Sequence, residues 1–337
     1  VYASLVGDYY DNIDKKAMLE AGLHAMFQYL GEDYTDYLNK EETDSLAEKL
    51  AGQYRGIGVQ IIADNIISKV FENTPASEAG ILAGDQIISI NGESVQGKST
   101  SLVSEMIQAS NDTVNISVLR NEENLSFQVP IKTMLLPVVQ TDIIENNEKR
   151  IGYMGISTFS STVAHQVSSA LESLEQQSIS SLIIDLRGNT GGYLSQATDI
   201  ASMFLEKGKV IYSLAEKNET KEHKDESDEK RDYPIVILMN EGTASASEIL
   251  AAALKDSYGA TLVGEVSYGK GKVQQTKNLE DGSMVKYTTA RWIRPNGDCI
   301  DGVGITPDIL IELQYSEEEV NLIDVQLKEA IRVLSEM

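Results

Sequence analysis

The segment "YPIVILMNEGTASASEILAAALKD", residues 233–256, places a continuous apolar run directly before a helical pattern. A short apolar run bounded by turn residues is typical of a strand that is buried on both faces. The glycine and small residues that follow Asn240 predict a sharp turn into a helix. A buried strand that leads into a helix is the repeating unit of layered α/β proteins.

The same alternation extends over the second half of the chain. Strand patterns and helical patterns alternate at residues 151–157, 162–177, 179–188, 193–205, 260–265, 308–313 and 316–334. Alternation at this spacing predicts an α/β layered core, which we place at residues 135–337, with a helix at its C-terminal end.

Two further regions precede this core. Residues 1–52 predict helices, and residues 15–30 carry one apolar stripe. Packing in the core of the chain is the favoured explanation of that stripe, and burial against a partner chain is the alternative. Residues 53–134 alternate in the manner of strands, with a hairpin signal at Asn91-Gly92, and predict a small separate domain.

Composition and charge exclude several classes of function. The net charge of −24 disfavours binding to nucleic acid or to anionic lipid. The single cysteine, Cys299, permits no disulfide within the chain, and His24, His165 and His223 are too far apart in sequence for a metal motif. We therefore expect no metal and no cofactor. The dense charges of residues 215–233 predict a solvated loop.

Ser245 admits two interpretations. Ser245 and Glu248 have the spacing of a capping box, which is a sufficient structural reason for both residues. A serine at a sharp strand-to-helix turn can also be a nucleophile, with the N–H of Ala246 placed to stabilise an oxyanion. Such a serine needs a base, and no histidine is well placed in the sequence. Lys270, between Gly269 and Gly271, could serve if burial lowered its pKa by about 3 units.

Two glycine-containing segments are further candidates for binding. The segment "DLRGNTGGYL", residues 185–194, can direct backbone N–H groups at an anion, but it lacks the spacing of nucleotide-binding loops. The segment "YRGIGVQI", residues 54–61, opens a strand with two glycines. Its free N–H groups can bind a C-terminal carboxylate while the strand pairs with an extended peptide.

Taken together and in order, these segments resemble the C-terminal processing peptidases, the tail-specific serine proteases. The motifs that carry the resemblance are "GIGVQI", "PASEAGILAGDQIISING", "DLRGNTGG", "NEGTASASEI", "VGEVSYGKGKVQ" and "WIRPNGDCIDGVGITPDI". The resemblance implies a protease core related to the Clp and crotonase layered folds, an inserted PDZ domain at residues 53–134, and flanking helices that often mediate dimerisation.

The resemblance also implies roles for individual residues. The nucleophile would be Ser245, the base Lys270 rather than Lys272, and the residue that supports the base Gln274. The oxyanion hole would use the N–H of Ala246 and that of a loop glycine, Gly191 or alternatively Gly188. The PDZ residues that bind the peptide would be Gly56, Ile57, Gly58 and Val59.

Partners and location follow from the same resemblance. We expect protein substrates with exposed apolar C-termini, a PDZ domain that binds those ends and gates the active site, and a homodimer. No regulatory partner can be named. We expect a longer full-length protein outside the cytoplasmic membrane, anchored or secreted.

Two other functions are compatible with parts of the pattern. One is a non-catalytic PDZ scaffold in which Ser245 only caps a helix, and the intact Ser245, Lys270 and Gln274 argue against it. The other is a crotonase-type enzyme that acts on acyl thioesters, suggested by the glycine loop. The PDZ segment and the paired serine and lysine argue against that.

Overall fold

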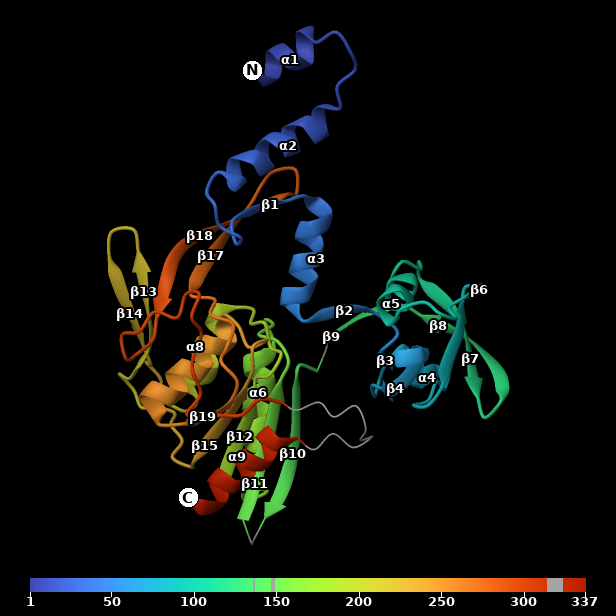
Figure 1. Ribbon diagram of the computed structural model, residues 1–337. Coiled ribbons are helices and arrows are strands. Elements are labelled where there is room, and N and C mark those ends of the chain that lie inside the picture. The colour runs from blue at the N-terminus through green and yellow to red at the C-terminus, as the bar shows by residue number, and fades with distance from the viewer. Residues whose placement is uncertain (136, 147–148, 314–323) are drawn as a thin grey trace. The chain divides into compact units, whose positions relative to one another are not determined.

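The computed structural model describes residues 1–135, 137–146, 149–313 and 324–337. The chain forms two compact units. The core unit comprises residues 1–51 and 137–337, and the inserted unit comprises residues 52–136. Each unit is described by itself (Figure 1).

The core unit is built on a six-stranded sheet in the order β10-β11-β12-β15-β16-β19. All neighbouring pairs are parallel except β10 and β11, which are antiparallel. Its strands are β10 (Val139–Asn146), β11 (Lys149–Ile156), β12 (Ser181–Asp185), β15 (Ile235–Met239), β16 (Thr261–Gly264) and β19 (Ile309–Leu310). Every residue of β12 and β15 is buried, as their continuous apolar runs predict.

Helices connect these strands and cover the sheet. They are α6 (Val163–Gln176), α7 (Leu194–Ser202), α8 (Ala246–Ala253) with the π-helical turn η2 (Leu254–Tyr258), and α9 (Val325–Glu336). The C-terminal helix α9, red in Figure 1, buries Ala330, Val333 and Leu334 against sheet residues that include Ile183 and Val236. Part of the predicted last helix, residues 316–323, lies outside the described residues.

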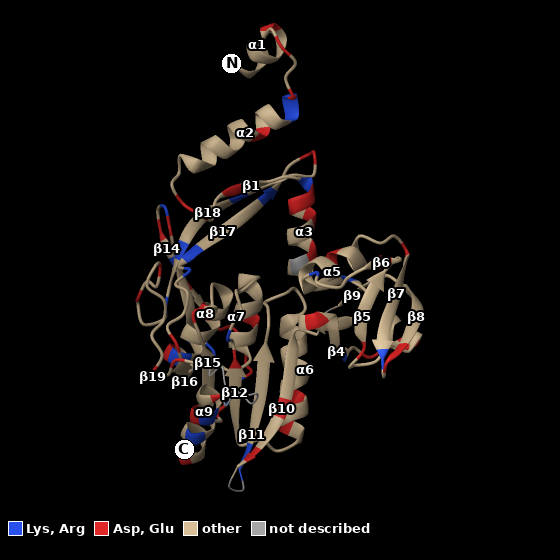
Figure 2. Ribbon diagram, turned by 45° about the vertical axis from the view of Figure 1, so that its right-hand side comes forward, with Lys and Arg blue, Asp and Glu red and all other residues tan. Residues whose placement is uncertain are grey.

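A second, antiparallel sheet of the core unit has the order β1-β18-β13-β14, with β17 paired to β18. Its strands are β1 (Asp36–Leu38), β13 (Val210–Glu216), β14 (Thr220–Lys224), β17 (Lys272–Asn278) and β18 (Met284–Ile293). Strands β17 and β18 carry the basic residues Lys272, Lys277, Lys286 and Arg291 (Figure 2). The β13–β14 hairpin shows that the prediction of a loop throughout residues 215–233 is wrong. Tyr212 and His223 stack across it, with ring centroids 4.5 Å apart.

The N-terminal region contains α1 (Tyr2–Asp8), α2 (Lys15–Gln28) and α3 (Lys40–Ala51). No residue of α2 is buried, and Leu19 and Met26 are exposed. The favoured interpretation of the stripe at residues 15–30, packing in the core of this chain, is therefore wrong.

The inserted unit has a five-stranded path in the order β3-β4-β5-β7-β8, with β6 paired to β5, and a separate β2–β9 pair. Its elements are β2 (Gln53–Gly56), β3 (Val59–Ile62), η1 (Ala63–Asn65), β4 (Ile66–Val70), α4 (Pro75–Ala79), β5 (Gln86–Ile90), β6 (Glu93–Ser94), α5 (Thr100–Gln108), β7 (Thr113–Arg120), β8 (Glu123–Pro130) and β9 (Lys132–Leu135). Asn91 and Gly92 form the β5–β6 turn, both with positive φ, which confirms the predicted hairpin.

Candidate active site

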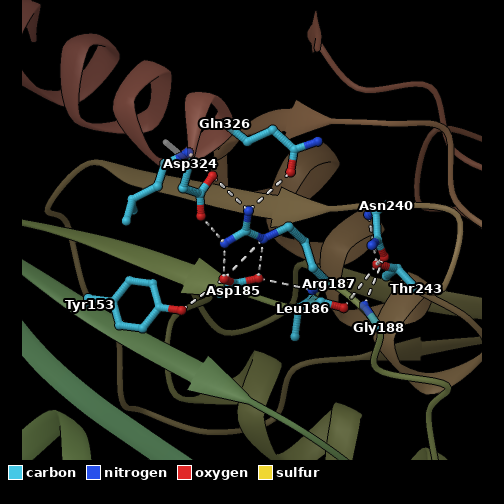
Figure 3. A network of polar contacts seen from close by, with 10 residues as sticks. Tyr153, Asp185, Leu186, Arg187, Gly188, Asn240, Thr243, Asp324 and Gln326 are labelled. Atoms are coloured by element: carbon cyan, nitrogen blue, oxygen red, sulfur yellow. Dashed lines mark hydrogen bonds and ion pairs between the residues drawn. The ribbon is translucent and has the colours of Figure 1, made fainter. Parts of the chain in front are cut away.

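Ser245 stands between β15 and α8 with φ 57° and ψ −118°. A helix-capping serine ordinarily has an extended backbone, and a non-glycine residue with positive φ is strained by about 1–3 kcal/mol. The turn before it is held in place because the Thr243 hydroxyl donates to the Leu186 carbonyl at 2.9 Å and accepts from the Asn240 N–H at 3.0 Å (Figure 3). Such strain is typical of functional positions rather than of simple caps.

The buried carboxylate of Glu248 joins the serine turn to the lysine loop. Its Oε2 accepts the backbone N–H of Ser245 at 2.7 Å and that of Lys270 at 3.0 Å. Its Oε1 accepts the Ser267 hydroxyl at 2.5 Å and the Gly269 N–H at 2.7 Å. Burial raises the pKa of Glu248 above its ordinary value, and these donors oppose the rise. The sequence pattern correctly pairs Ser245 with Glu248, but it gives no sign of the bonds to residues 267–270.

Lys270 is partly buried in the wall of the core unit. Burial, and then the positive charge of Lys286, lowers the pKa of Lys270, while Glu248 and Glu32 oppose that change. No hydrogen bond joins the Lys270 amine to the Ser245 hydroxyl in this structure, both residues being described. A lysine with a lowered pKa can supply the neutral amine that a general base requires.

Lys272 has different surroundings. Its Nζ lies 3.3 Å from a carboxylate oxygen of Glu32, whose side chain is only 13% exposed. No comparable ion pair is found for Lys270 among the described residues. A paired ammonium is a poor base, so the geometry favours Lys270 over Lys272 for that role.

Gln274, expected to support the base, donates instead to the Thr288 hydroxyl at 3.3 Å. Within the described part of the chain it makes no hydrogen bond to Lys270, although both residues line the same groove.

The predicted oxyanion donors differ in whether their N–H groups already have a hydrogen-bond acceptor. Gly191 packs against the serine turn, since a Cβ added there would lie 2.9 Å from the Ser245 Cβ. Its N–H, however, donates to the Asn189 side chain at 2.9 Å, and the Gly188 N–H donates to the Asn240 side chain at 2.8 Å. In the described part of the chain the N–H groups of Ala246 and Gly192 have no protein acceptor.

These residues open onto one groove of the core unit, with a volume of about 720 Å³. Ser245, Ala246, Gly191, Lys270 and Gln274 all line it, whereas Gly188 does not. The apolar part of its wall is formed by Leu46, Leu50, Leu194, Leu214, Ile249, Val273 and Trp292. The groove is large enough for several residues of an extended peptide.

Arg187 ties the glycine loop to the C-terminal helix (Figure 3). Its guanidinium donates to both carboxylate oxygens of Asp185, to Asp324 at 2.9 Å and to Gln326 at 3.2 Å. The Tyr153 hydroxyl also donates to Asp185, at 2.8 Å. Asp324 caps α9 through the Leu327 N–H. These contacts of Arg187 were not predicted from the sequence, although a charged pair, Asp185 and Arg187, at the end of a buried strand was a visible signal.

The predicted peptide-binding residues lie in the inserted unit, where Gly56, Ile57, Gly58 and Val59 are all buried. Strand β3, which begins at Val59, is an edge strand that pairs only with β4 in the described part of its sheet. Gly58 has φ 86°, and a Cβ there would lie 2.3 Å from the Thr74 Cβ, so only glycine fits. An open edge strand after a glycine turn is suited to adding a peptide strand.

Comparisons with known proteins define the class. The model of peptidase family S41 matches residues 150–311, and the PDZ domain model matches residues 49–131. The chain belongs to peptidase family S41. It is a serine-type peptidase of the C-terminal processing group that carries a PDZ domain and acts on protein substrates.

Particular relatives agree with this class. The chain is 36% identical to carboxy-terminal processing protease CtpA of Bacillus subtilis over 93% of this chain and 68% of the relative. It is 34% identical to CtpB of the same organism, over 98% of this chain and 70% of the relative. The solved photosystem II D1 C-terminal processing protease is 26% identical, with TM-score 0.59 over 98% of this chain and 89% of that one.

The predicted fold class, a layered α/β protease core with an inserted PDZ domain, is thereby confirmed. In the described part of the chain, no helix combines the length and apolar character needed to cross a membrane.

Proposed function

We propose that the protein cleaves polypeptides near their C-termini with Ser245 as nucleophile and Lys270 as general base. The observation that carries this proposal is that one buried carboxylate, Glu248, binds the backbone of both residues at the edge of one groove. The partial burial of Lys270, which lowers its pKa, and the strained backbone of Ser245 support the same assignment.

The reaction begins when the neutral Lys270 amine accepts the hydroxyl proton of Ser245 and Oγ attacks the substrate carbonyl carbon. The resulting oxyanion is stabilised by the N–H of Ala246 and by a second N–H from the loop at residues 188–192. For that second donor we favour Gly192 in the present arrangement, because the N–H groups of Gly188 and Gly191 already have acceptors.

Collapse of the tetrahedral intermediate breaks the peptide C–N bond. The Lys270 ammonium gives its proton to the leaving nitrogen, and the acyl group remains on Ser245 Oγ. Water then attacks the ester, Lys270 accepts a proton from it, and the proton returns to Ser245 as the acid product leaves. Gln274 is proposed to orient the lysine once its bond to Thr288 is exchanged.

The PDZ domain is proposed to bind the free C-terminus of a substrate at Gly56, Ile57, Gly58 and Val59, with an apolar terminal side chain preferred. We also propose that the unliganded PDZ domain blocks the groove. Deletion of residues 55–133 should then raise the turnover of a short peptide, and unchanged or lower turnover would reject the blocking proposal.

The proposal also covers self-association and the location of the full-length protein. The exposed apolar residues of α2, including Leu19 and Met26, are proposed to pack against a second copy of the chain. We also propose, from the resemblance to processing proteases, that the full-length protein is located outside the cytoplasmic membrane, anchored or secreted.

The catalytic assignment is tested with Ser245→Ala and Lys270→Arg in an assay on casein and on a peptide with an apolar C-terminus. Both variants should lose turnover while their Tm stays close to that of the wild type. Lys272→Arg is the matched control and should retain turnover. A wild-type protein that binds the peptide but cleaves nothing would instead favour a PDZ scaffold.

A further inference from the structure

A short N-terminal segment, residues 32–38, is docked beside the base. Strand β1 pairs with β18 through Asp36 opposite Lys286 and Leu38 opposite Met284. The Thr35 hydroxyl accepts the Thr288 N–H at 3.0 Å, and Glu32 pairs with Lys272. These contacts hold the segment on the sheet that follows the lysine loop.

The segment places the ring of Tyr34 next to the proposed base. The Lys270 Nζ lies 4.9 Å from the centre of this ring, and the Lys272 Nζ lies 5.5 Å from it. Both distances fall within the range of cation–π attraction, which extends to about 6 Å. Lys272 also has the Glu32 carboxylate as a partner, whereas in the described residues no ion pair is found for Lys270, whose ammonium lies close to the ring.

The ring acts here as a neutral aromatic group. Burial, and then the neighbouring Tyr268, Asp301 and Asp33, raises the pKa of Tyr34 to about 12. The phenol therefore stays protonated over the pH range of an assay, and its attraction for Lys270 comes from the ring quadrupole rather than from a phenolate charge.

We infer that Tyr34 is a positioning residue for the base: its ring holds the Lys270 ammonium in a resting position that the lysine leaves to reach Ser245. The inference rests on the proposed function and adds to it a regulatory contact from the N-terminal segment. An aromatic face attracts the ammonium much more strongly than the neutral amine, so the contact opposes the deprotonation that catalysis requires.

Other charged groups face Lys270 from the surrounding elements. Lys286 of β18 favours the neutral amine, whereas Glu248 of α8 and Glu32 of the N-terminal segment favour the ammonium. Lys272 shares the ring. Tyr34→Leu leaves Lys286, Glu248 and Glu32 in place and removes the ring from both lysines, whereas Tyr34→Phe keeps the ring for both.

The test compares Tyr34→Leu with Tyr34→Phe in the full chain, with the pH profile of kcat/KM as readout. Leucine keeps the apolar bulk but removes the aromatic face. The acid limb of the profile should therefore shift to lower pH by about 0.5–1 unit. At a pH on that limb, kcat/KM should rise about 3- to 10-fold. Phenylalanine keeps the face and should reproduce the wild-type profile. The inference would be overturned if the acid limb of Tyr34→Leu stayed at the wild-type pH or shifted to higher pH. It would also be overturned if Tyr34→Phe gave the same profile as Tyr34→Leu.

A direct titration keeps the test independent of turnover. In a Ser245→Ala background, NMR of the labelled Lys270 side chain should report a lower pKa with Tyr34→Leu than with Tyr34 or Phe. The same titration can be made in a protein that cleaves nothing, so failure of the proposed function and failure of this inference remain distinguishable. Equal pKa values in all three proteins would overturn it.

Discussion

Glu248→Gln is the substitution that we expect to disturb the hydrogen bonds of the site most. The carboxylate accepts four donors, two at each oxygen, and all come from the serine turn or the lysine loop. A glutamine amide keeps one acceptor oxygen and turns an NH₂ group toward the other two donors. Two buried donors would then lose their acceptor.

The expected loss of stability follows from the number of donors left without an acceptor. A buried donor left without a partner costs about 1–3 kcal/mol, so the free energy of unfolding should fall by about 2–6 kcal/mol. For a chain of 337 residues we expect a decrease in Tm of about 3–9 °C. Since a displacement of about 1 Å between reacting groups can cost 100-fold, kcat should fall at least that far, with a smaller change in KM.

The pH dependence provides a second readout. The native pKa of Glu248 lies above its ordinary 4.5, so the native state binds this proton more tightly than the unfolded state. Its contribution to stability is fully present below pH 4.5 and is lost as the pH rises through the raised native value. Urea unfolding at several pH values should show this decline in the wild type, and the difference from Glu248→Gln should reveal it.

The control is Glu241→Gln, the same chemical change at an exposed residue of the serine turn. It should leave Tm and kcat close to the wild-type values. If Glu248→Gln kept its kcat within about 3-fold and its Tm within about 1 °C, Glu248 would not be the link between Ser245 and Lys270, given the cost expected for unpaired donors.

Three further predictions concern other parts of the molecule. Ser245→Gly should have a higher Tm than Ser245→Ala, because only glycine relieves the strain at φ 57°, and calorimetry of both inactive proteins checks this; equal Tm values would contradict it. The pKa of Asp324 is lowered chiefly by Arg187, despite burial, so its stabilising effect is present above pH 3.8 and is lost as the pH falls through the lowered value. Urea unfolding at several acidic pH values should show that Asp324→Asn lacks this loss of stability. The same dependence of the unfolding free energy on pH in both proteins would count against the prediction. Gly58→Ala should weaken binding of a labelled peptide with a free C-terminus at least about 10-fold, measured by fluorescence anisotropy, whereas Gly80→Ala, which adds a Cβ in open space, should not.

The strands and the order of the motifs could be predicted from the sequence because their signals are local. The apolar runs of β12 and β15, and the turn at Asn91-Gly92, each lie within a few consecutive residues. The serine turn is of the same kind, since a buried strand, small residues and a helix follow one another directly.

The surroundings of the base could not be predicted in this way. Tyr34 and Glu32 reach Lys270 and Lys272 only because β1 pairs with β18, and no local pattern encodes that pairing. The β13–β14 hairpin was missed because its charged residues lack the apolar alternation that marks a half-buried strand. The stripe of α2 was assigned to the core because periodicity predicts an apolar face without identifying what covers it.

Trapping of the acyl-enzyme is the most direct test of Ser245 as nucleophile and Lys270 as base. An activated peptide ester would be mixed with the protein, the reaction quenched in acid, and the site of acylation located by peptide mapping. We expect acyl transfer to Ser245 in the wild type and in Lys272→Arg, and none in Lys270→Arg. Acylation of a different residue, or undiminished labelling of Ser245 in Lys270→Arg, would contradict it.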